Sequence, residues 1–262
     1  MQVQAIKSRI VKPNDNLFAA IDEAILADPN LKGHLPENSV LAISSKVISY
    51  CQGRVIKKSD DKEVKHNLAK QEAELYTDPS SSKFDLMLTI KNSTLIVNAG
   101  IDESNASMDG QACYVLWPEK IQETINEIWQ YLRTKYQLKN FGVITTDSRS
   151  FPLRWGVVGT AIAYCGFKSL NNHIGEPDLF GRKMVMEQVN VAEALGVAAT
   201  FEMGEVAEQT PFVLVSNLKN VQFASEVPSF KELADNKISL EDDLYAPLLT
   251  KVDWKKGGSF NE

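Results

Sequence analysis

Three acidic side chains stand where predicted secondary-structure elements end. Asp102 follows an apolar run that ends at Ala99, Asp147 follows the apolar run 141–145, and Glu205 follows a predicted long helix. Hard cations such as Mg2+ and Mn2+ prefer carboxylate, carbonyl and hydroxyl oxygens, often one or two carboxylates together with substrate phosphates. A single acidic residue after a strand is more commonly a turn or cap residue. Together, the three would form a divalent-metal site if the fold brings them to one place.

The sequence offers little support for other kinds of catalytic site. His34, His66 and His173 have no paired spacing, and we interpret them as surface or structural residues. The three cysteines are widely spaced and form no CxxC pair, which excludes a disulfide framework and a thiolate zinc site. We therefore expect a reduced, cytoplasmic protein.

The overall composition limits the partners of this chain. A net charge of −6 argues against nucleic acid, because duplex-binding proteins usually carry a basic surface. The amino terminus has no signal-peptide pattern, and no apolar run approaches the roughly 20 residues that a membrane span requires. We expect neither nucleic acid nor membrane as a partner. An acidic protein that handles phosphates must neutralise them locally, with metal ions or a few Lys and Arg residues.

The elements that would position these residues follow from apolar spacing and from turn residues. Strands are predicted at 3–11, 40–44, 47–55, 86–90, 95–99, 141–145, 154–167 and 212–216. Helices are predicted at 17–25, 60–76, 118–136, 183–203, 229–234 and 239–249, before a frayed end at 257–258. Hairpins mix with helical connections, so the expected class is α+β, with mixed, largely antiparallel sheets and packed helices.

Several motifs resemble those of the coenzyme F420:L-glutamate ligase family, also called F420-0:gamma-glutamyl ligases. The run Val97–Asn105 reads VNAGIDESN and resembles the NAGIDxSN motif of that family. Further segments match motifs of that family in unbroken order over about 36–216. They are 41–55, which matches VVxxKIVSKxEGRV, 146–148, which matches TD[ST], 154–163, which matches RxGxxGxAI, and 174–182, which matches G..D.yGR. The segments 203–205 (MGE) and 211–215 (PFVLV) follow at a compatible distance.

This resemblance implies a GTP-dependent amide ligase that adds L-glutamate to a carboxylate of the deazaflavin precursor F420-0 through an acyl phosphate. It implies two Mg2+ or Mn2+ ions, leaves room for K+, and suggests an interlocked homodimer. The expected fold is that of the family over residues 1–262, as one unit or as two intertwined subdomains. The residue roles that it implies are Asp102 and Asp147 for one metal, Ser148 and Glu205 for a second, Asp102, Asp147 and Arg154 for catalysis, and Ser45, Lys46, Asn105 and Gly204 for the nucleotide.

The departures from the family pattern concern the nucleotide and the acceptor. Tyr50 stands where the family has a nucleotide-contacting Lys, Gln52 replaces an acidic residue, and the segment 206–210 lacks the usual glycines. Because Tyr cannot replace an ammonium near phosphate, the choice between GTP and ATP and the identity of the acceptor stay open. One alternative is the same ligation on another acceptor, such as a folate. The others are a metal-dependent phosphohydrolase and a non-catalytic nucleotide-binding protein. Arg154 and Arg182 are candidates either for contacts to phosphate or to the acceptor anion, or for salt bridges between domains or subunits.

Overall fold

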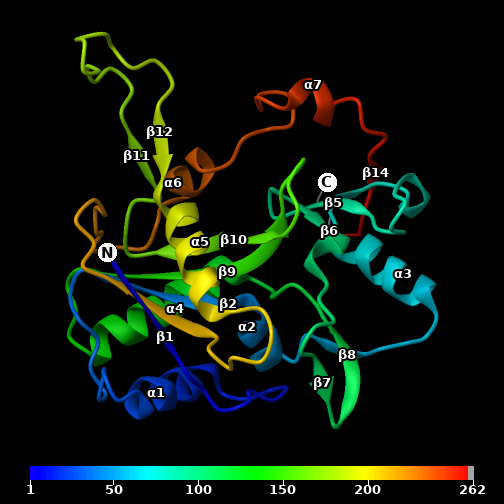
Figure 1. Cartoon of the computed structure of the whole chain (residues 1–262), viewed down its shortest axis with the longest axis horizontal. Coiled ribbons are helices and arrows are strands. Elements are labelled where there is room, and N and C mark those ends of the chain that lie inside the picture. Colours follow the sequence, from blue (N-terminus) through cyan, green and yellow to red (C-terminus); the bar gives the residue numbers. More distant parts are fainter. Residues whose placement is uncertain (259–262) are drawn as a thin grey trace.

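A computed structural model describes residues 1–258 of the chain, and its centre is a five-stranded sheet (Figure 1). The strand order is β1-β13-β2-β9-β10. The bounds are Gln2–Ile6 for β1, Phe212–Ser216 for β13, Ser39–Ser44 for β2, Phe141–Ser150 for β9 and Val157–Cys165 for β10. Every neighbouring pair is antiparallel except β2 and β9, which are parallel.

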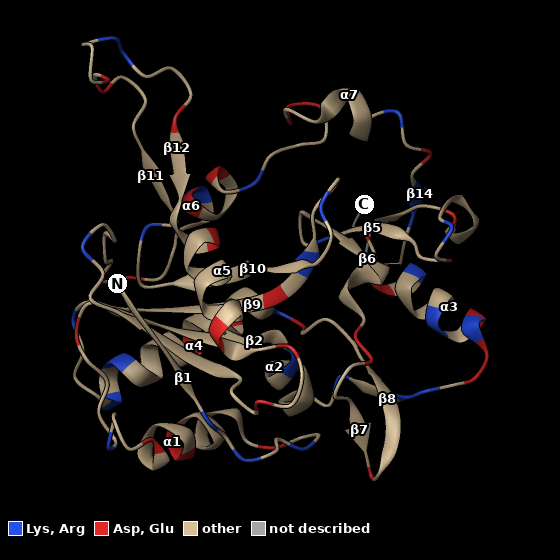
Figure 2. Cartoon of the chain, viewed as in Figure 1, with Lys and Arg blue, Asp and Glu red and all other residues tan. Residues whose placement is uncertain are grey.

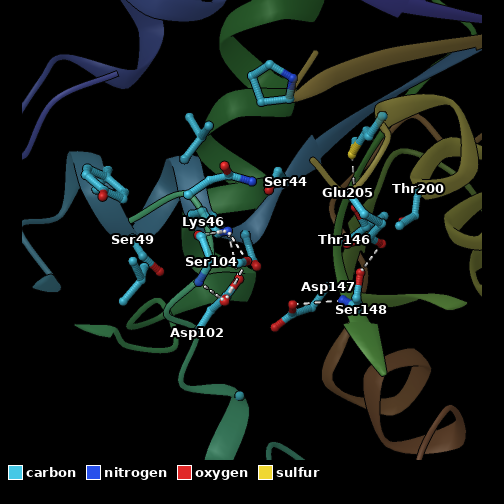
Figure 3. A pocket seen from close by; sticks show the side chains of 18 of the residues that line it. Ser44, Lys46, Ser49, Asp102, Ser104, Thr146, Asp147, Ser148, Thr200 and Glu205 are labelled. Carbon is cyan, nitrogen blue, oxygen red and sulfur yellow. Dashed lines mark hydrogen bonds and ion pairs between the residues drawn. The ribbon is translucent and has the colours of Figure 1, made fainter. Parts of the chain in front are cut away.

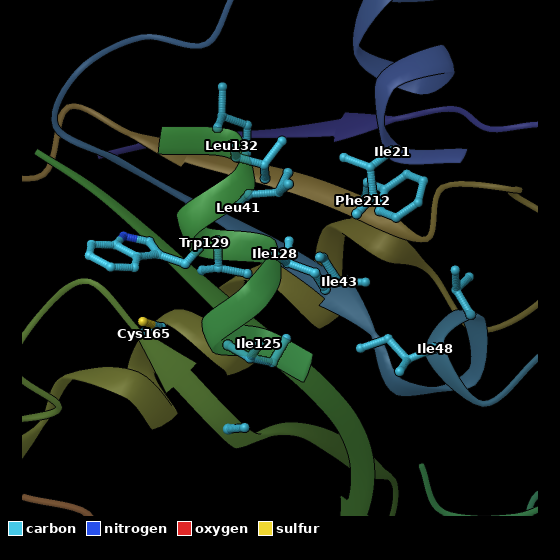
Figure 4. Close-up of a cluster of buried hydrophobic side chains, with 14 of the residues drawn as sticks. Ile21, Leu41, Ile43, Ile48, Ile125, Ile128, Trp129, Leu132, Cys165 and Phe212 are labelled. Carbon is cyan, nitrogen blue, oxygen red and sulfur yellow. The ribbon is translucent and has the colours of Figure 1, made fainter. Parts of the chain in front are cut away.

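Helices cover both faces of this sheet. The helices α1 (Leu17–Ala27), α2 (Ser45–Cys51) and α4 (Ile121–Lys135) contribute to one hydrophobic core, and α5 (Val191–Met203) contributes to the other. Residues of β2 alternate between these cores, because successive side chains of a strand point to opposite faces. Figure 4 shows Leu41 and Ile43 in the first core, near Ile125, Ile128 and Leu132 of α4. This double cover explains why β2 is apolar throughout.

A second group of small sheets lies beside the central one. One has the order β14-β4-β5-β6 and another the order β3-β8-β7, while β11 and β12 form a projecting arm. Their bounds are Val55–Lys57 for β3, Leu75–Tyr76 for β4, Leu88–Lys91 for β5, Thr94–Val97 for β6, Ser107–Met108 for β7, Gln111–Val115 for β8, Leu170–Asn172 for β11, Gln188–Asn190 for β12 and Lys255–Lys256 for β14.

The remaining helices are short or lie at the surface. They are α3 (Lys62–Glu72), α6 (Phe230–Asp235) and α7 (Ala246–Leu249), with 3-10 turns at Pro79–Ser81 and Asn98–Gly100. The mixed sheets, mostly antiparallel and packed with helices, confirm the predicted α+β class. Within residues 1–258 no helix is long and apolar enough to cross a membrane.

Two element predictions are wrong because tertiary contacts override local preference. The run 47–55 forms α2 and then β3, rather than one strand, since the helix buries Val47, Ile48 and Tyr50 directly after β2 ends. The helix predicted over 183–203 begins only at Val191. Asn190 caps its first turn by accepting a hydrogen bond from the Glu193 backbone N–H at 3.0 Å, and β12 precedes it.

The carboxyl-terminal predictions need correction as well. Of the run 239–249, only Ala246–Leu249 is helical, because Pro247 is favoured in the first turn and disfavoured in a helix interior. The expected frayed end is instead fixed to the second group of sheets. The Gly257 backbone N–H donates to the Glu74 carbonyl at 2.9 Å, and a Cβ at this glycine would lie 2.1 Å from the Ala73 carbonyl oxygen.

Candidate active site

A cavity of about 840 Å3 opens between the central sheet and the second group of sheets, and almost all of the predicted site residues line it (Figure 3). These residues are Ser45, Lys46, Asp102, Asn105, Asp147, Ser148, Gly204 and Glu205. They come from the start of α2, the turn after β6, the outer half of β9 and the loop after α5. The fold therefore brings segments that are distant in sequence to one hollow.

The parallel pair β2 and β9 sets one wall of this cavity. β2 ends at Ser44, opposite Thr146, and α2 begins at the next residue. β9 does not end near Thr145 as predicted, because β10 continues to pair with it as far as Ser150. Asp147 therefore lies inside a strand, one residue beyond the end of β2. The carboxyl ends of parallel strands are the usual place for ligands in sheets of this kind.

Backbone contacts fix the position of Asp102. Its N–H donates to the Val115 carbonyl at 3.0 Å, and its carbonyl accepts from the Val115 N–H at 2.8 Å. The preceding Gly100 has a φ of +73°, and a Cβ there would lie 2.5 Å from the Trp117 ring and 3.5 Å from Asp147 Oδ2. Only glycine allows this close approach. The NAGID turn thereby places Asp102 on the same cavity as Asp147.

Lys46 holds the Asp102 carboxylate from the opposite wall. Lys46 Nζ lies 2.7 Å from Asp102 Oδ2 and donates to the Ser104 carbonyl at 2.7 Å. Ser104 donates to Asp102 Oδ1 from its backbone N–H at 2.7 Å and from its hydroxyl at 2.8 Å. Burial alone would raise the pKa of Asp102, but Lys46 and these hydrogen bonds outweigh it and lower the pKa. Asp102 is therefore ionised at neutral pH.

Asp147 has the opposite environment. Burial raises its pKa to about 7, and the negative charges of Asp102 and Glu205 act in the same direction. The Ser148 N–H donates to Asp147 Oδ1 at 2.8 Å, which opposes the rise only in part. Figure 3 shows the carboxyl group of Asp147 pointing from β9 towards the side where Asp102 and Lys46 lie. Within residues 1–258 the charge of Lys46 lowers the pKa of Asp147 only in part and no ion pair neutralises the Asp147 carboxylate, so a positive charge at this place would be stabilised.

Glu205 and the loop around it close the third side. Ser148 Oγ donates to Glu205 Oε1 at 2.7 Å. Asn105 Nδ2 donates to the Val206 carbonyl and so joins the Asp102 turn to the loop after α5. Gly204 ends α5 with a φ of +73°, where a side chain would meet the carboxyl group of Glu208. The loop therefore depends on one glycine to turn past the cavity.

The donor set fits hard divalent cations. It consists of Asp102, Asp147, Ser148 and Glu205, all of them oxygen donors that line the cavity. Across residues 1–258, no three His, Cys, Asp or Glu side chains are gathered tightly enough to enclose one ion. These side chains supply only part of a coordination shell, as is usual where Mg2+ is bound mostly by substrate phosphates and water.

Three arginines outside this donor set complete the comparison with the sequence. Arg154 is exposed at the β9–β10 turn, donates to the Leu153 carbonyl at 3.1 Å, and is not part of the cavity wall. Arg182 lies on the projecting arm and pairs with Asp178 at 2.8 Å, a local contact within the arm rather than a salt bridge between domains or subunits. Arg149, by contrast, lines the cavity. No role was predicted for it, although it follows Asp147 by two residues and so shares its face of β9.

Sequence comparisons agree with this arrangement of motifs. The profile of the family described as F420-0:Gamma-glutamyl ligase matches residues 5–217. The coenzyme F420:L-glutamate ligase of Methanopyrus kandleri is 30% identical over 229 residues, covering 80% of this chain and 84% of that protein. The enzymes of the same name from Methanococcus maripaludis and Archaeoglobus fulgidus are 29% and 28% identical, covering 82% and 80% of this chain and 90% and 84% of their own lengths. The chain thus belongs to the F420-0:gamma-glutamyl ligase family.

Proposed function

We propose that this chain is a nucleotide- and divalent-metal-dependent amide ligase that adds L-glutamate to a carboxylate of coenzyme F420-0 or a related small acid. The observation that carries the proposal is the convergence of Asp102, Asp147, Ser148 and Glu205 on one cavity beside Lys46. Membership of a ligase family supports an enzyme that forms carbon–nitrogen bonds, and the named relatives ligate L-glutamate to coenzyme F420.

The reaction needs an activated carboxylate, because a carboxylate and an amine do not condense in water unaided. An oxygen of the acceptor carboxylate attacks the γ-phosphorus of the nucleoside triphosphate, the bond from that phosphorus to the bridging oxygen breaks, and the nucleoside diphosphate leaves. The amine of glutamate then attacks the acyl carbon of the acyl phosphate, and inorganic phosphate leaves as the amine loses its proton. The first step brings two anions together, so it requires concentrated positive charge.

The residues of this chain supply places for that charge. Asp102 with Asp147, and Ser148 with Glu205, would hold Mg2+ or Mn2+, which when bound would neutralise the phosphate oxygens and the acceptor carboxylate. Lys46 adds a fixed ammonium group beside Asp102. Ser45, Asn105 and Gly204 would face the nucleotide, since they line the same cavity. K+ is a further ion that this acidic wall would accept.

GTP is the nucleotide that we propose, although Tyr50 cannot make the phosphate contact of the Lys that the family has at this position. The hydroxyl of Tyr50 accepts a hydrogen bond from the Ser107 backbone N–H at 2.8 Å, donates to the Ser107 carbonyl at 3.2 Å, and lies 3.5 Å from Cys113 Sγ. Burial and Cys113 raise the pKa of Tyr50 to about 12, so it is neutral at physiological pH. Tyr50 thus stabilises the hairpin of β7 and β8 and supplies no charge to a phosphate. This supports keeping ATP and a different acceptor, such as a folate, among the tested substrates.

A homodimer is part of the proposal, and exposed apolar side chains support it. Leu153 and Trp155 at the β9–β10 turn are 96% and 95% exposed, and Leu179 on the projecting arm is 99% exposed. Apolar groups on extended segments commonly mark a protein interface. The three cysteines are free, which suits the reducing cytoplasm where we place the protein. Sedimentation velocity will test the dimer, and a monomer across micromolar concentrations will refute it.

Substrate-dependent turnover tests the function directly. The purified chain is incubated with GTP or ATP, Mn2+ or Mg2+, L-glutamate and either F420-0 or a folate, and the products are measured by mass spectrometry. Ligation requires nucleotide hydrolysis that depends on both the acceptor and glutamate, with a product heavier by one glutamyl residue. Hydrolysis indifferent to glutamate would instead indicate a phosphohydrolase. Nucleotide-induced thermal stabilisation without turnover would indicate a non-catalytic binding protein.

A further inference from the structure

Three cationic side chains line the cavity within residues 1–258, and their partners differ. Arg9 lies 2.5 Å from Asp15 and 2.8 Å from Glu23, so two carboxylates neutralise it. Lys46 lies 2.7 Å from Asp102. Arg149 has only Glu193 within ion-pair range, and that contact is long, at 3.8 Å. Of the three, Arg149 is the cation whose charge is least compensated.

One donor of Arg149 is also left without an acceptor. Both oxygens of Glu193 already accept hydrogen bonds, Oε1 from the Thr160 hydroxyl at 2.9 Å and Oε2 from the Ala161 N–H at 3.2 Å. The Nε group of Arg149 is buried and has no hydrogen-bond partner. A buried donor without an acceptor is costly, and natural proteins rarely retain one without a reason. The guanidinium is therefore held near Glu193 but remains available to another anion.

The position of the guanidinium group is defined by its surroundings. The Cζ atom of Arg149 lies 4.8 Å from the centre of the Phe151 ring, and the side chain of Arg149 is 25% exposed. Figure 2 shows a red and a blue band close together along β9, whose sole charged residues are Asp147 and Arg149. Residues two apart on a strand share a face and lie about 7 Å apart. A small ligand could therefore contact both Arg149 and the acidic cluster.

We propose that Arg149 binds a carboxylate of the incoming amino acid, an inference that rests on the ligase function proposed above. A guanidinium group matches a carboxylate with two parallel hydrogen bonds, and it keeps its charge at every physiological pH. The metal ions that Asp102, Asp147 and Glu205 would hold are taken up by the phosphates and the acceptor carboxylate, so the carboxylate of the amino acid needs a cation outside that cluster. With its carboxylate on Arg149, the amine is directed towards the acyl carbon formed beside the cluster. Arg149 is accordingly a specificity-determining residue.

Steady-state kinetics of Arg149→Met and Arg149→Lys test this inference. Loss of a charge-assisted contact predicts a rise of about 10- to 100-fold in KM for L-glutamate in Arg149→Met, while KM for the nucleotide changes by less than about twofold. Arg149→Lys keeps the charge but loses the bidentate geometry, so its KM for glutamate should rise about 3- to 10-fold. Lys219→Met removes one charge from an exposed position outside the cavity wall and serves as the control. Thermal unfolding without ligands checks that each variant is folded.

The outcomes separate the two proposals. An unchanged KM for glutamate in both folded Arg149 variants, with an active wild type, overturns the inference and leaves the ligase function intact. A rise in KM for the nucleotide alone also overturns it, and assigns Arg149 to a phosphate. A rise for the acceptor alone overturns it in favour of the acceptor carboxylate. A wild type with no glutamate-dependent turnover refutes the ligase function and this inference together.

Discussion

The carboxyl group of Asp147 lies where its negative charge is unfavourable, and this has a measurable effect on stability. Its pKa in the folded chain is raised from 3.8 to about 7 by burial and by Asp102 and Glu205. The folded state therefore binds more protons than the unfolded state between these values. Stability is fully present below the unfolded pKa and is lost as pH rises through the folded pKa. Replacing Asp147 by Asn, which stays neutral, should remove this loss.

The expected size of this stability loss follows from the pH interval over which it develops. Two pH units separate pH 5 from the folded pKa, which corresponds to about 2.7 kcal/mol. Asp147 is partly exposed to the cavity, and solvent there screens its charge, so we halve this to about 1.3 kcal/mol. The variant Asp147→Asn should therefore gain about 1.3 kcal/mol over the wild type between pH 5 and pH 8. Its amide oxygen can still accept from the Ser148 N–H, so the fold is retained.

Urea unfolding at pH 5 and pH 8, in the presence of EDTA, measures this gain. Asp102→Asn is the matched control, because the pKa of Asp102 is lowered in the folded chain and its carboxylate pairs with Lys46. That variant should be less stable than the wild type at pH 8, by no more than about 1 kcal/mol for this half-exposed pair. The reasoning is refuted if the Asp147→Asn difference is equal at the two pH values, or if Asp147→Asn is the less stable protein at pH 8.

Three other predictions concern the cavity and the carboxyl-terminal segment. Lys46→Met removes the cation that lowers the pKa of Asp147, so the pH midpoint of the stability loss should move upward in the same urea series, and an unmoved midpoint would contradict it. Gly100→Ala should lower the unfolding free energy by about 2 kcal/mol or more, because of its positive φ and the Trp117 ring at 2.5 Å, as read from the urea midpoint. Gly257→Ala should release the chain end, giving faster proteolysis of 236–251 with about 1 kcal/mol or less of global change; unchanged cleavage would argue against it.

Much of the fold follows from local patterns in the sequence. The stripe Ile121, Ile125, Ile128 and Leu132 gives α4, whose apolar side chains are buried as the spacing predicts. The hairpin of β5 and β6 and the buried strands β2 and β13 are also found where apolar runs predict them. Strong periodic segments of this kind depend mainly on burying one face, so their type can be inferred without knowing the partner.

Only the tertiary structure decided where these segments meet. The run 47–55 is rich in β-branched and aromatic residues, yet it begins as a helix because β2 ends at Ser44 and the helical face is buried there. The outer part of β9 exists because β10 pairs with it, and this pairing puts Asp147 and Arg149 on one face.

The acidic and hydroxyl residues of the site, in contrast, were identifiable from sequence as types but not as neighbours. Ser148 and Glu205 are 57 residues apart, and Asn105 and Val206 are 101 apart, yet each pair is joined by a hydrogen bond. Arg149 carried no local signal, because its proposed role rests on its long contact with Glu193 and its unpaired Nε group, and both depend on the packing of α5 beside β10. The sequence thus determined which side chains are available, whereas charge compensation, burial and pKa depend on long-range packing that no local pattern contains.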